Sequence, residues 1–169
     1  MNRLFLPLIL LAALLLPAAG CSGETAKPAI PAFSENDLLL CINETDYSCN
    51  INIDQVISGL GEGYRYAEGQ SCDYDGLDKS FIYDVAEFYT SPLALGDTVN
   101  EIYTTSPGAA TSRGITVGAS REDILAAYGP ATDDEGDMLI YRLENDRTVL
   151  CFELDDNEVW AIYLTIQSV

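Results

Sequence analysis

The sequence predicts an α+β domain built from tandem repeats, each a short helix followed by an antiparallel sheet. Residues 52–61 and 118–129 have the composition of short helices that end at a glycine. Strand-like runs follow each of them, and those of the C-terminal half alternate between apolar and polar residues. Because alternation with period two is typical of a sheet with one packed face, we expect the helices to cover that face.

The second helix has clear start and stop signals. Ser120, with Asp123 three residues later, forms a capping-box pattern at its beginning. Gly129 can take the left-handed conformation that ends a helix, and Pro130 prevents the helix from continuing. Helical spacing then places the apolar residues on one face: Ile124, Leu125 and Tyr128.

The two halves of the chain correspond in their strand-like runs. The apolar-apolar-tyrosine run at residues 81–83 corresponds to the run at 139–141. We therefore expect the first repeat over about residues 51–105 and the second over about 114–167.

Alternation in the second repeat assigns its side chains to two faces of a sheet. The face that is expected to be packed carries Leu150, Phe152, Trp160 and Ile162. The opposite face is unusually apolar for an exposed surface, which indicates either a contact surface or a face covered by a loop or by the first repeat. The residues predicted on this opposite face are Val149, Cys151, Val159, Ala161, Tyr163 and Thr165.

The N-terminus has the pattern of an export signal. A positively charged start precedes an apolar run over residues 4–16, and small residues then lead to Cys21. The run is shorter than the roughly twenty residues that cross a bilayer as a helix, so it predicts a signal peptide over residues 1–20. Residues 18–21 (Ala-Ala-Gly-Cys) resemble the lipobox of bacterial lipoproteins, with alanine where leucine is usual. That resemblance implies lipidation of Cys21 by two or three acyl chains, palmitate among them.

Cleavage before Cys21 would leave a lipidated tether over residues 21–34 and a domain over 35–169. The tether contains proline and glycine and lacks hydrophobic periodicity. The alternative is an ordinary secretory signal cut near Ala19, which leaves Cys21 as a plain thiol. Both interpretations place the domain outside the cytoplasm, and the first one anchors it to the extracytoplasmic face of the cell membrane.

The charge of the chain limits its partners. There are 27 acidic and 8 basic residues, for a formal net charge of −19. A chain with no basic patch is repelled by nucleic acid and by anionic membrane surfaces. We therefore expect no nucleic-acid partner, and a membrane attachment through the lipid alone.

Four cysteines follow Cys21, and an even number in an exported chain indicates disulfides. Three pairings are possible. Cys41 and Cys49 flank a predicted hairpin turn, so a bridge between them is plausible and leaves Cys72 with Cys151. Closing that long loop would stabilise the fold by about 4 kcal/mol in the chain-entropy picture. The spacings lack the paired cysteines of structural zinc sites, so no metal is expected there.

The composition argues against an enzyme. The chain has no histidine, which removes the commonest general base and the Ser-His and Cys-His pairs. It also has no glycine-rich phosphate loop, and we expect no cofactor. Two carboxylates suffice to cleave a glycoside, so a small carboxylate-dependent wall hydrolase is the alternative function.

A calcium site is a further alternative. Asp73, Asp75 and Asp78 surround Gly76, and calcium prefers such carboxylate oxygens. The EF-hand spacing fails, because its sixth position would be Asp78 and not glycine. Aspartate and glycine also fill ordinary turns, which is the preferred interpretation, with a calcium-dependent structural module kept as an alternative.

Several motifs resemble known proteins over roughly residues 51–166. Residues 114–118 (Gly-Ile-Thr-Val-Gly), the capped segment 120–125 and the Tyr-Gly-Pro of 128–130 resemble the β-lactamase-inhibitor-protein fold and the small barrel-assembly lipoproteins that share its helix-plus-sheet unit. Residues 71–83 resemble a group of lipoproteins of Gram-positive bacteria with no assigned activity. The resemblance implies a non-catalytic module that binds a protein or wall component. No inhibitory loop matches, so β-lactamase inhibition itself is not implied.

Overall fold

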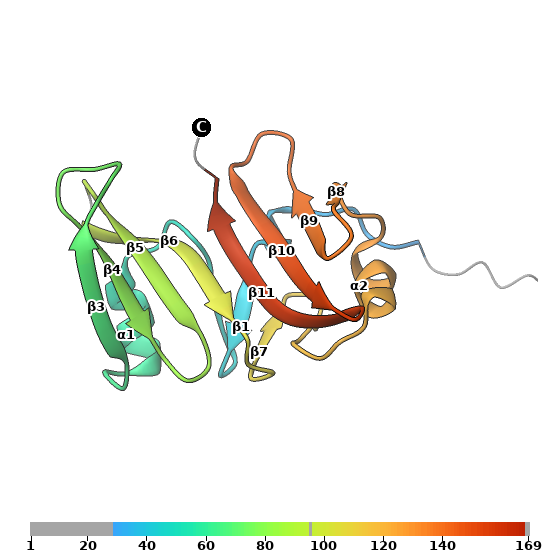
Figure 1. Cartoon of the computed structure of the whole chain (residues 1–169), viewed down its shortest axis with the longest axis horizontal. Coiled ribbons are helices and arrows are strands. Elements are labelled where there is room, and N and C mark those ends of the chain that lie inside the picture. Colours follow the sequence, from blue (N-terminus) through green and yellow to red (C-terminus); the bar gives the residue numbers. More distant parts are fainter. Residues whose placement is uncertain (1–28, 95, 168–169) are drawn as a thin grey trace, which may run out of the picture.

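The protein is dominated by one large antiparallel sheet. The structure is a computed structural model and describes residues 29–94 and 96–167, so the predicted signal peptide and the lipidation site Cys21 lie outside the described residues. The sheet has eight strands (Figure 1). In spatial order they are β3 (Arg65–Gln70), β4 (Leu77–Ile82), β5 (Glu87–Leu93), β6 (Gly96–Thr104), β11 (Glu158–Ile166), β10 (Thr148–Asp155), β9 (Met138–Arg142) and β8 (Asp133–Asp134).

Smaller elements pack against this sheet. The described residues form two α-helices, α1 (Ile53–Leu60) and α2 (Arg121–Tyr128), and one 3₁₀ turn, η1 (Glu35–Asp37). A separate three-stranded antiparallel sheet consists of β2 (Thr45–Tyr47), β1 (Leu40–Ile42) and β7 (Ala109–Thr111). No helix among the described residues is long and apolar enough to span a membrane.

The predicted α+β class with tandem helix-plus-sheet repeats is wrong, because the protein is mostly β. Strands make up 46% of the described residues and helices 14%. The halves predicted as repeats, residues 51–105 and 114–167, do not form separate units, since β6 of the first half pairs with β11 of the second. An unpaired strand edge exposes backbone donors and acceptors that favour pairing with another strand. Here the edges of β6 and β11 pair with each other and join both halves into one sheet.

The local helix signals, in contrast, are confirmed. The Asn52 side chain accepts a hydrogen bond from the backbone N–H of Asp54 at the start of α1. Ser120 and Asp123 form the expected capping box at the start of α2. Both helices end at glycines with positive φ, Gly61 at 82° and Gly129 at 78°.

The main core lies between the eight-stranded sheet and the smaller elements. Helix residues such as Val56 and Ile124 share this core with Leu40 of β1 and with Phe88 and Leu150 of the large sheet. Both helices and the three-stranded sheet therefore cover the same face of the large sheet. The opposite face, called here the open face, is turned toward the viewer in Figure 1.

A bulge in the β10–β11 pair changes the predicted assignment of faces. The register shifts between Glu153 and Leu154, and Trp160 has no partner opposite it. Val159 pairs with Leu154 and is buried in the core, whereas Trp160 is 46% exposed. The predictions that Val159 faces outward and that Trp160 is packed are therefore wrong, because one extra residue reverses the alternation before it.

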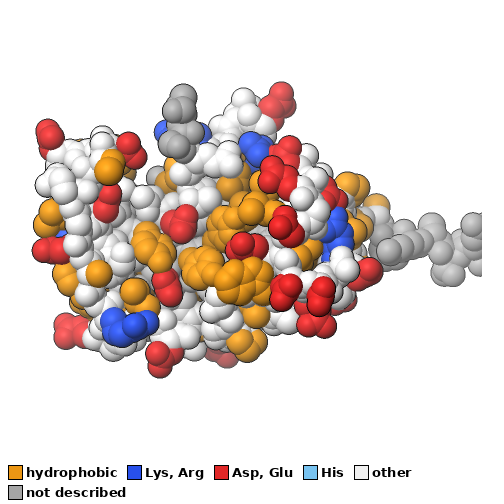
Figure 2. Space-filling view, in the orientation of Figure 1, with side chains coloured by type: hydrophobic (Ala, Val, Ile, Leu, Met, Phe, Trp, Pro, Cys, Tyr) orange, Lys and Arg blue, Asp and Glu red, His pale blue; other side chains and the backbone are white. Residues whose placement is uncertain are grey.

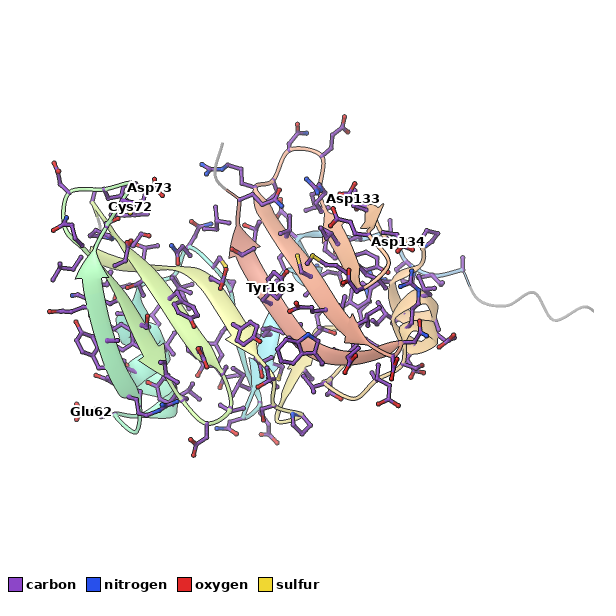
Figure 3. All side chains as sticks on the ribbon, viewed as in Figure 1. Glu62, Cys72, Asp73, Asp133, Asp134 and Tyr163 are labelled. Carbon is purple, nitrogen blue, oxygen red and sulfur yellow. The ribbon has the colours of Figure 1, made fainter. Side chains whose placement is uncertain are left out.

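The predicted disulfides are not present: all four described cysteines are free. The β1–β2 register places Cys41 opposite Asp46, while the buried Cys49 thiol lies 3.5 Å from the carbonyl oxygen of Asn100. Cys72 lies in the β3–β4 loop, and Cys151 is opposite Tyr163 in the sheet. Figure 3 shows Tyr163 far from that loop. The Cys72–Cys151 pairing fails because these two residues belong to opposite halves of the large sheet. The Cys41–Cys49 pairing fails because the β1–β2 register sets Asp46, and not Cys49, opposite Cys41.

This arrangement predicts the reactivity of the thiols. Burial raises the pKa of both Cys49 and Cys151 to about 12. We expect an alkylating reagent to modify exposed Cys72 in the native protein, and to modify Cys49 and Cys151 only after unfolding. Mass spectrometry of alkylated peptides with and without prior reduction measures this. Peptides joined by a bridge that reductant separates would contradict the prediction.

Candidate functional site

The open face is the face of the large sheet that the described helices and the three-stranded sheet leave uncovered. Its middle is formed by β5, β6 and β11, which come from both halves of the chain. Figure 2 shows apolar and acidic side chains across the middle of this face, and basic side chains only toward its margins. A rigid, uncovered sheet surface of this kind is a candidate for binding.

The residues predicted for this face fall into two groups. Tyr163 and Thr165 are partly exposed on it. Val149, Cys151 and Ala161 are covered, with exposed fractions of 1%, 2% and 0%. Val149 and Cys151 form a small apolar cluster with neighbouring side chains, among them Ile140, Met138 and Tyr163. Tyr163 therefore forms the outer surface of this cluster and remains partly exposed on the open face.

At the centre of the open face, tyrosines and glutamates lie opposite one another on neighbouring strands. The β5–β6 register sets Tyr103 opposite Glu87 and Glu101 opposite Tyr89. Directly opposite residues of an antiparallel pair project from the same face of a sheet. Tyr163 of β11 lies opposite Tyr103, with ring centroids 6.2 Å apart. We call these five residues the Tyr–Glu patch.

The tyrosines of the Tyr–Glu patch are held in their neutral form. The hydrogen bond that the Tyr89 hydroxyl donates to Glu87, together with burial, raises the pKa of Tyr89 to about 12. Burial and the charges of nearby glutamates, Glu153 first among them, also raise the pKa of Tyr103. Burial similarly raises the pKa of Tyr163. At neutral pH the patch therefore presents neutral tyrosine rings beside its two glutamates.

Most of the described basic residues already have acidic partners. Lys79 Nζ lies 2.7 Å from Asp97 Oδ2. Three arginines are paired in the same way. These pairs are Arg113 with Asp37, Arg121 with Asp134, and Arg142 with Asp133. The glutamates of the Tyr–Glu patch have no such ion pair among the described residues.

A hollow of about 520 Å³ lies beside the Tyr–Glu patch. Tyr89 and Glu101 of the patch contribute to its lining, so the two features are continuous. Two buried acceptors in the lining, Asp78 Oδ1 and Asn100 Oδ1, receive no hydrogen bond from the described residues. We call it the central hollow, and it is lined by Ala67, Glu68, Gly69, Asp78, Lys79, Ser80, Tyr89, Thr90, Asn100, Glu101, Thr165 and Ile166.

The three aspartates considered for calcium do not form a site. Asp73 and Asp75 are exposed in the β3–β4 loop, where Figure 3 shows Asp73 beside Cys72. Asp78 lies on β4 and lines the central hollow. Within residues 29–94 and 96–167, no three potential metal ligands gather closely enough to hold an ion. The calcium-dependent alternative therefore gains no support from the described residues.

Four residues of the Tyr–Glu patch were not predicted from the sequence, although a repeated sequence pattern indicates them. Residues 87–90 read Glu-Phe-Tyr-Thr and residues 101–104 read Glu-Ile-Tyr-Thr. When two copies of a Glu-x-Tyr motif pair in antiparallel register about their middle residues, each glutamate faces a tyrosine. Phe88 and Ile102 are those middle residues, and they pair in the structure.

Comparisons with known proteins give no match: no protein-family model, curated protein or solved structure is similar to this chain. The resemblances to the lipobox and to the β-lactamase-inhibitor-protein fold therefore remain predictions. The candidate site rests on the geometry of the open face alone.

Proposed function

We propose that the protein is a non-catalytic binding module, anchored by lipid at Cys21 to the extracytoplasmic face of the cell membrane, whose open face binds a protein partner. The single observation that carries this proposal is the uncovered Tyr–Glu patch at the centre of a rigid sheet. Tyrosine is enriched at protein interfaces because it provides a large contact area together with a polar group. The lipid anchor and the extracytoplasmic location come from the sequence pattern.

The rigidity of this surface supports a binding role. Each tyrosine of the patch lies on a strand paired on both sides, and Phe88 and Ile102, between the patch residues, are fully buried. A surface held in place before binding loses little conformational entropy when a partner docks. The apolar cluster under Tyr163 also fixes that ring from below.

Site-specific photo-crosslinking in intact cells tests this proposal. A photoreactive amino acid at the position of Tyr163 is compared with one at Gln55, an exposed residue of α1 on the covered side of the sheet. We expect a discrete protein adduct from position 163 and none of the same size from position 55. Equal adducts from both positions, or no adduct from either, would contradict the proposal.

Two further outcomes are informative. An adduct from position 163 that muramidase digests would identify wall glycan instead of protein and would overturn the choice of partner. Replacing Tyr103 and Tyr163 by alanine should reduce the protein adduct captured from position 89. An undiminished adduct in that double variant would exclude the patch as the contact surface.

A further inference from the structure

We infer that the partner presents a basic segment, and that a lysine or arginine side chain of this segment occupies the central hollow beside Glu101 and Tyr89. This inference rests on the proposed function, since it names the chemistry of the partner that the open face would bind. Three features of the hollow support it. Among the described residues, they are two buried oxygen acceptors that receive no hydrogen bond, acidic side chains without a basic partner, and neutral tyrosine rings beside the hollow.

The first feature is the pair of unmet acceptors. Asp78 Oδ1 and Asn100 Oδ1 are buried without a hydrogen-bond donor among the described residues. The side-chain amide nitrogen of Asn100 donates a hydrogen bond to Ser91 Oγ at 2.7 Å, whereas the amide oxygen of the same side chain receives none from the described residues. A buried acceptor without a donor is unfavourable. An ammonium group offers three donors and a guanidinium five, and neither group competes as an acceptor.

The second feature is the sign of the charge. Glu101 and Asp78 line the hollow, and the only basic residue in the lining, Lys79, is paired with Asp97. An acidic partner would be repelled by this surface, whereas a basic one would be attracted over a distance set by ionic strength. The charge of the whole chain, −19, acts in the same direction.

The third feature is the aromatic rim. Tyr89 of β5 lines the hollow, and Tyr103 lies on the next strand, β6, between Tyr89 and Tyr163 of β11 on the same face. Cations are attracted to the faces of aromatic rings, and the attraction needs no change in the protonation of the tyrosine. A lysine or arginine side chain could therefore place its stem against the rings and its charge against Glu101.

A titration with defined peptides tests the inference. The probe is a ten-residue peptide of alternating lysine and glycine, and its counterpart has glutamate in place of lysine. Binding is followed by calorimetry and by the fluorescence of Trp160, the single tryptophan of the chain, which is exposed on β11. We expect saturable binding of the lysine peptide, weakened by salt, and no binding of the glutamate peptide.

A matched pair of charge-neutralising variants locates the site. Asp78→Asn with Glu101→Gln removes two charges from the hollow, and we expect it to weaken binding by about tenfold. Glu62→Gln with Glu122→Gln removes two charges elsewhere, at exposed positions outside the hollow, and is expected to leave binding within about twofold of the unmodified protein. Equal affinities of the two double variants, or equal binding of both peptides, would overturn the inference.

The crosslinking experiment at position 163 separates this inference from the proposed function. If an adduct forms and mass spectrometry maps it to a segment rich in lysine or arginine, both stand. If the mapped segment is neutral or acidic, the binding function stands and the basic-partner inference fails. If no position-specific adduct forms, the proposed function itself fails.

Discussion

Replacing Arg113 with alanine is expected to lower the free energy of unfolding by about 3–5 kcal/mol, because it leaves a buried carboxylate without its partner. The Arg113 guanidinium holds both carboxylate oxygens of Asp37, with Nε–Oδ1 and Nη2–Oδ2 distances of 2.7 Å each. The side chain of Asp37 is only 6% exposed. Denaturant unfolding of the variant and the unmodified protein measures the difference.

The same guanidinium also ties the N-terminal segment to the domain. It donates to the backbone carbonyls of Pro31 and Ala32, each at 2.9 Å, and to the carbonyl of Ala127 at the end of α2. Its carbon lies 4.7 Å from the ring centre of Tyr128. We therefore expect Arg113→Ala to raise amide hydrogen exchange in residues 31–38 as well as to destabilise the fold.

A matched control and a pH series distinguish this ion pair from a general effect of losing an arginine. Among the described residues, the exposed Arg147 side chain donates only to the carbonyl oxygen of Gln167, so Arg147→Ala should change stability by no more than about 0.5 kcal/mol. Burial raises the pKa of Asp37, but hydrogen bonds from Arg113 and Ser34 outweigh burial and hold it below its ordinary value. Stability from such a group is present above its unfolded pKa of about 3.9 and is lost as the pH falls through the folded pKa. The difference between Arg113→Ala and the unmodified protein should shrink over that acidic range, and a difference independent of pH would contradict the ion-pair explanation.

Replacing Phe152 with alanine is expected to cost about 3–5 kcal/mol, whereas Trp160→Ala should cost less than about 1 kcal/mol. Phe152 is fully buried and its ring contacts those of Tyr128 and Tyr141, with centroids 5.7 and 5.9 Å away. Trp160 is 46% exposed at the bulge of β11. The alternating sequence assigns both residues to the packed face, so this pair of variants tests the bulge directly.

Thermal and denaturant unfolding of the two variants gives the comparison, with Phe152→Leu as a milder substitution at the same position. Phe152→Leu keeps most of the buried volume and should lose well under half of the stability that Phe152→Ala loses. A loss in Trp160→Ala as large as that in Phe152→Ala would mean that Trp160 is packed and that the strand continues without a bulge.

Local features of this chain could be read directly from its sequence. The capping of α2 by Ser120, the glycine at its end and the burial of Leu150, Phe152 and Ile162 are confirmed. Each depends on residues close together in the chain, where the spacing itself fixes the geometry. The predicted outward position of Val159 is wrong, because a single extra residue in one strand changes the face of every residue beyond it.

The candidate site could be predicted only in part. Tyr163 was identified because alternation alone places it on the open face, where the structure also has it partly exposed. Glu101 and Tyr89 were missed, although the repeated Glu-x-Tyr pattern was visible, because their opposition requires the pairing of β5 with β6. The disulfide prediction failed for a similar reason: spacing along the chain does not report which strands become neighbours.

By itself, the sequence determined the strongly acidic character of the chain, its two capped helices and the apolar face of its C-terminal strands. Only the tertiary structure decided that β6 pairs with β11, which joins all eight strands into one sheet and brings Tyr103 beside Tyr163. The physical reason is that side-chain periodicity and capping depend on residues a few positions apart. Strand pairing, in contrast, joins segments that are far apart in the sequence, and it depends on how the whole core packs.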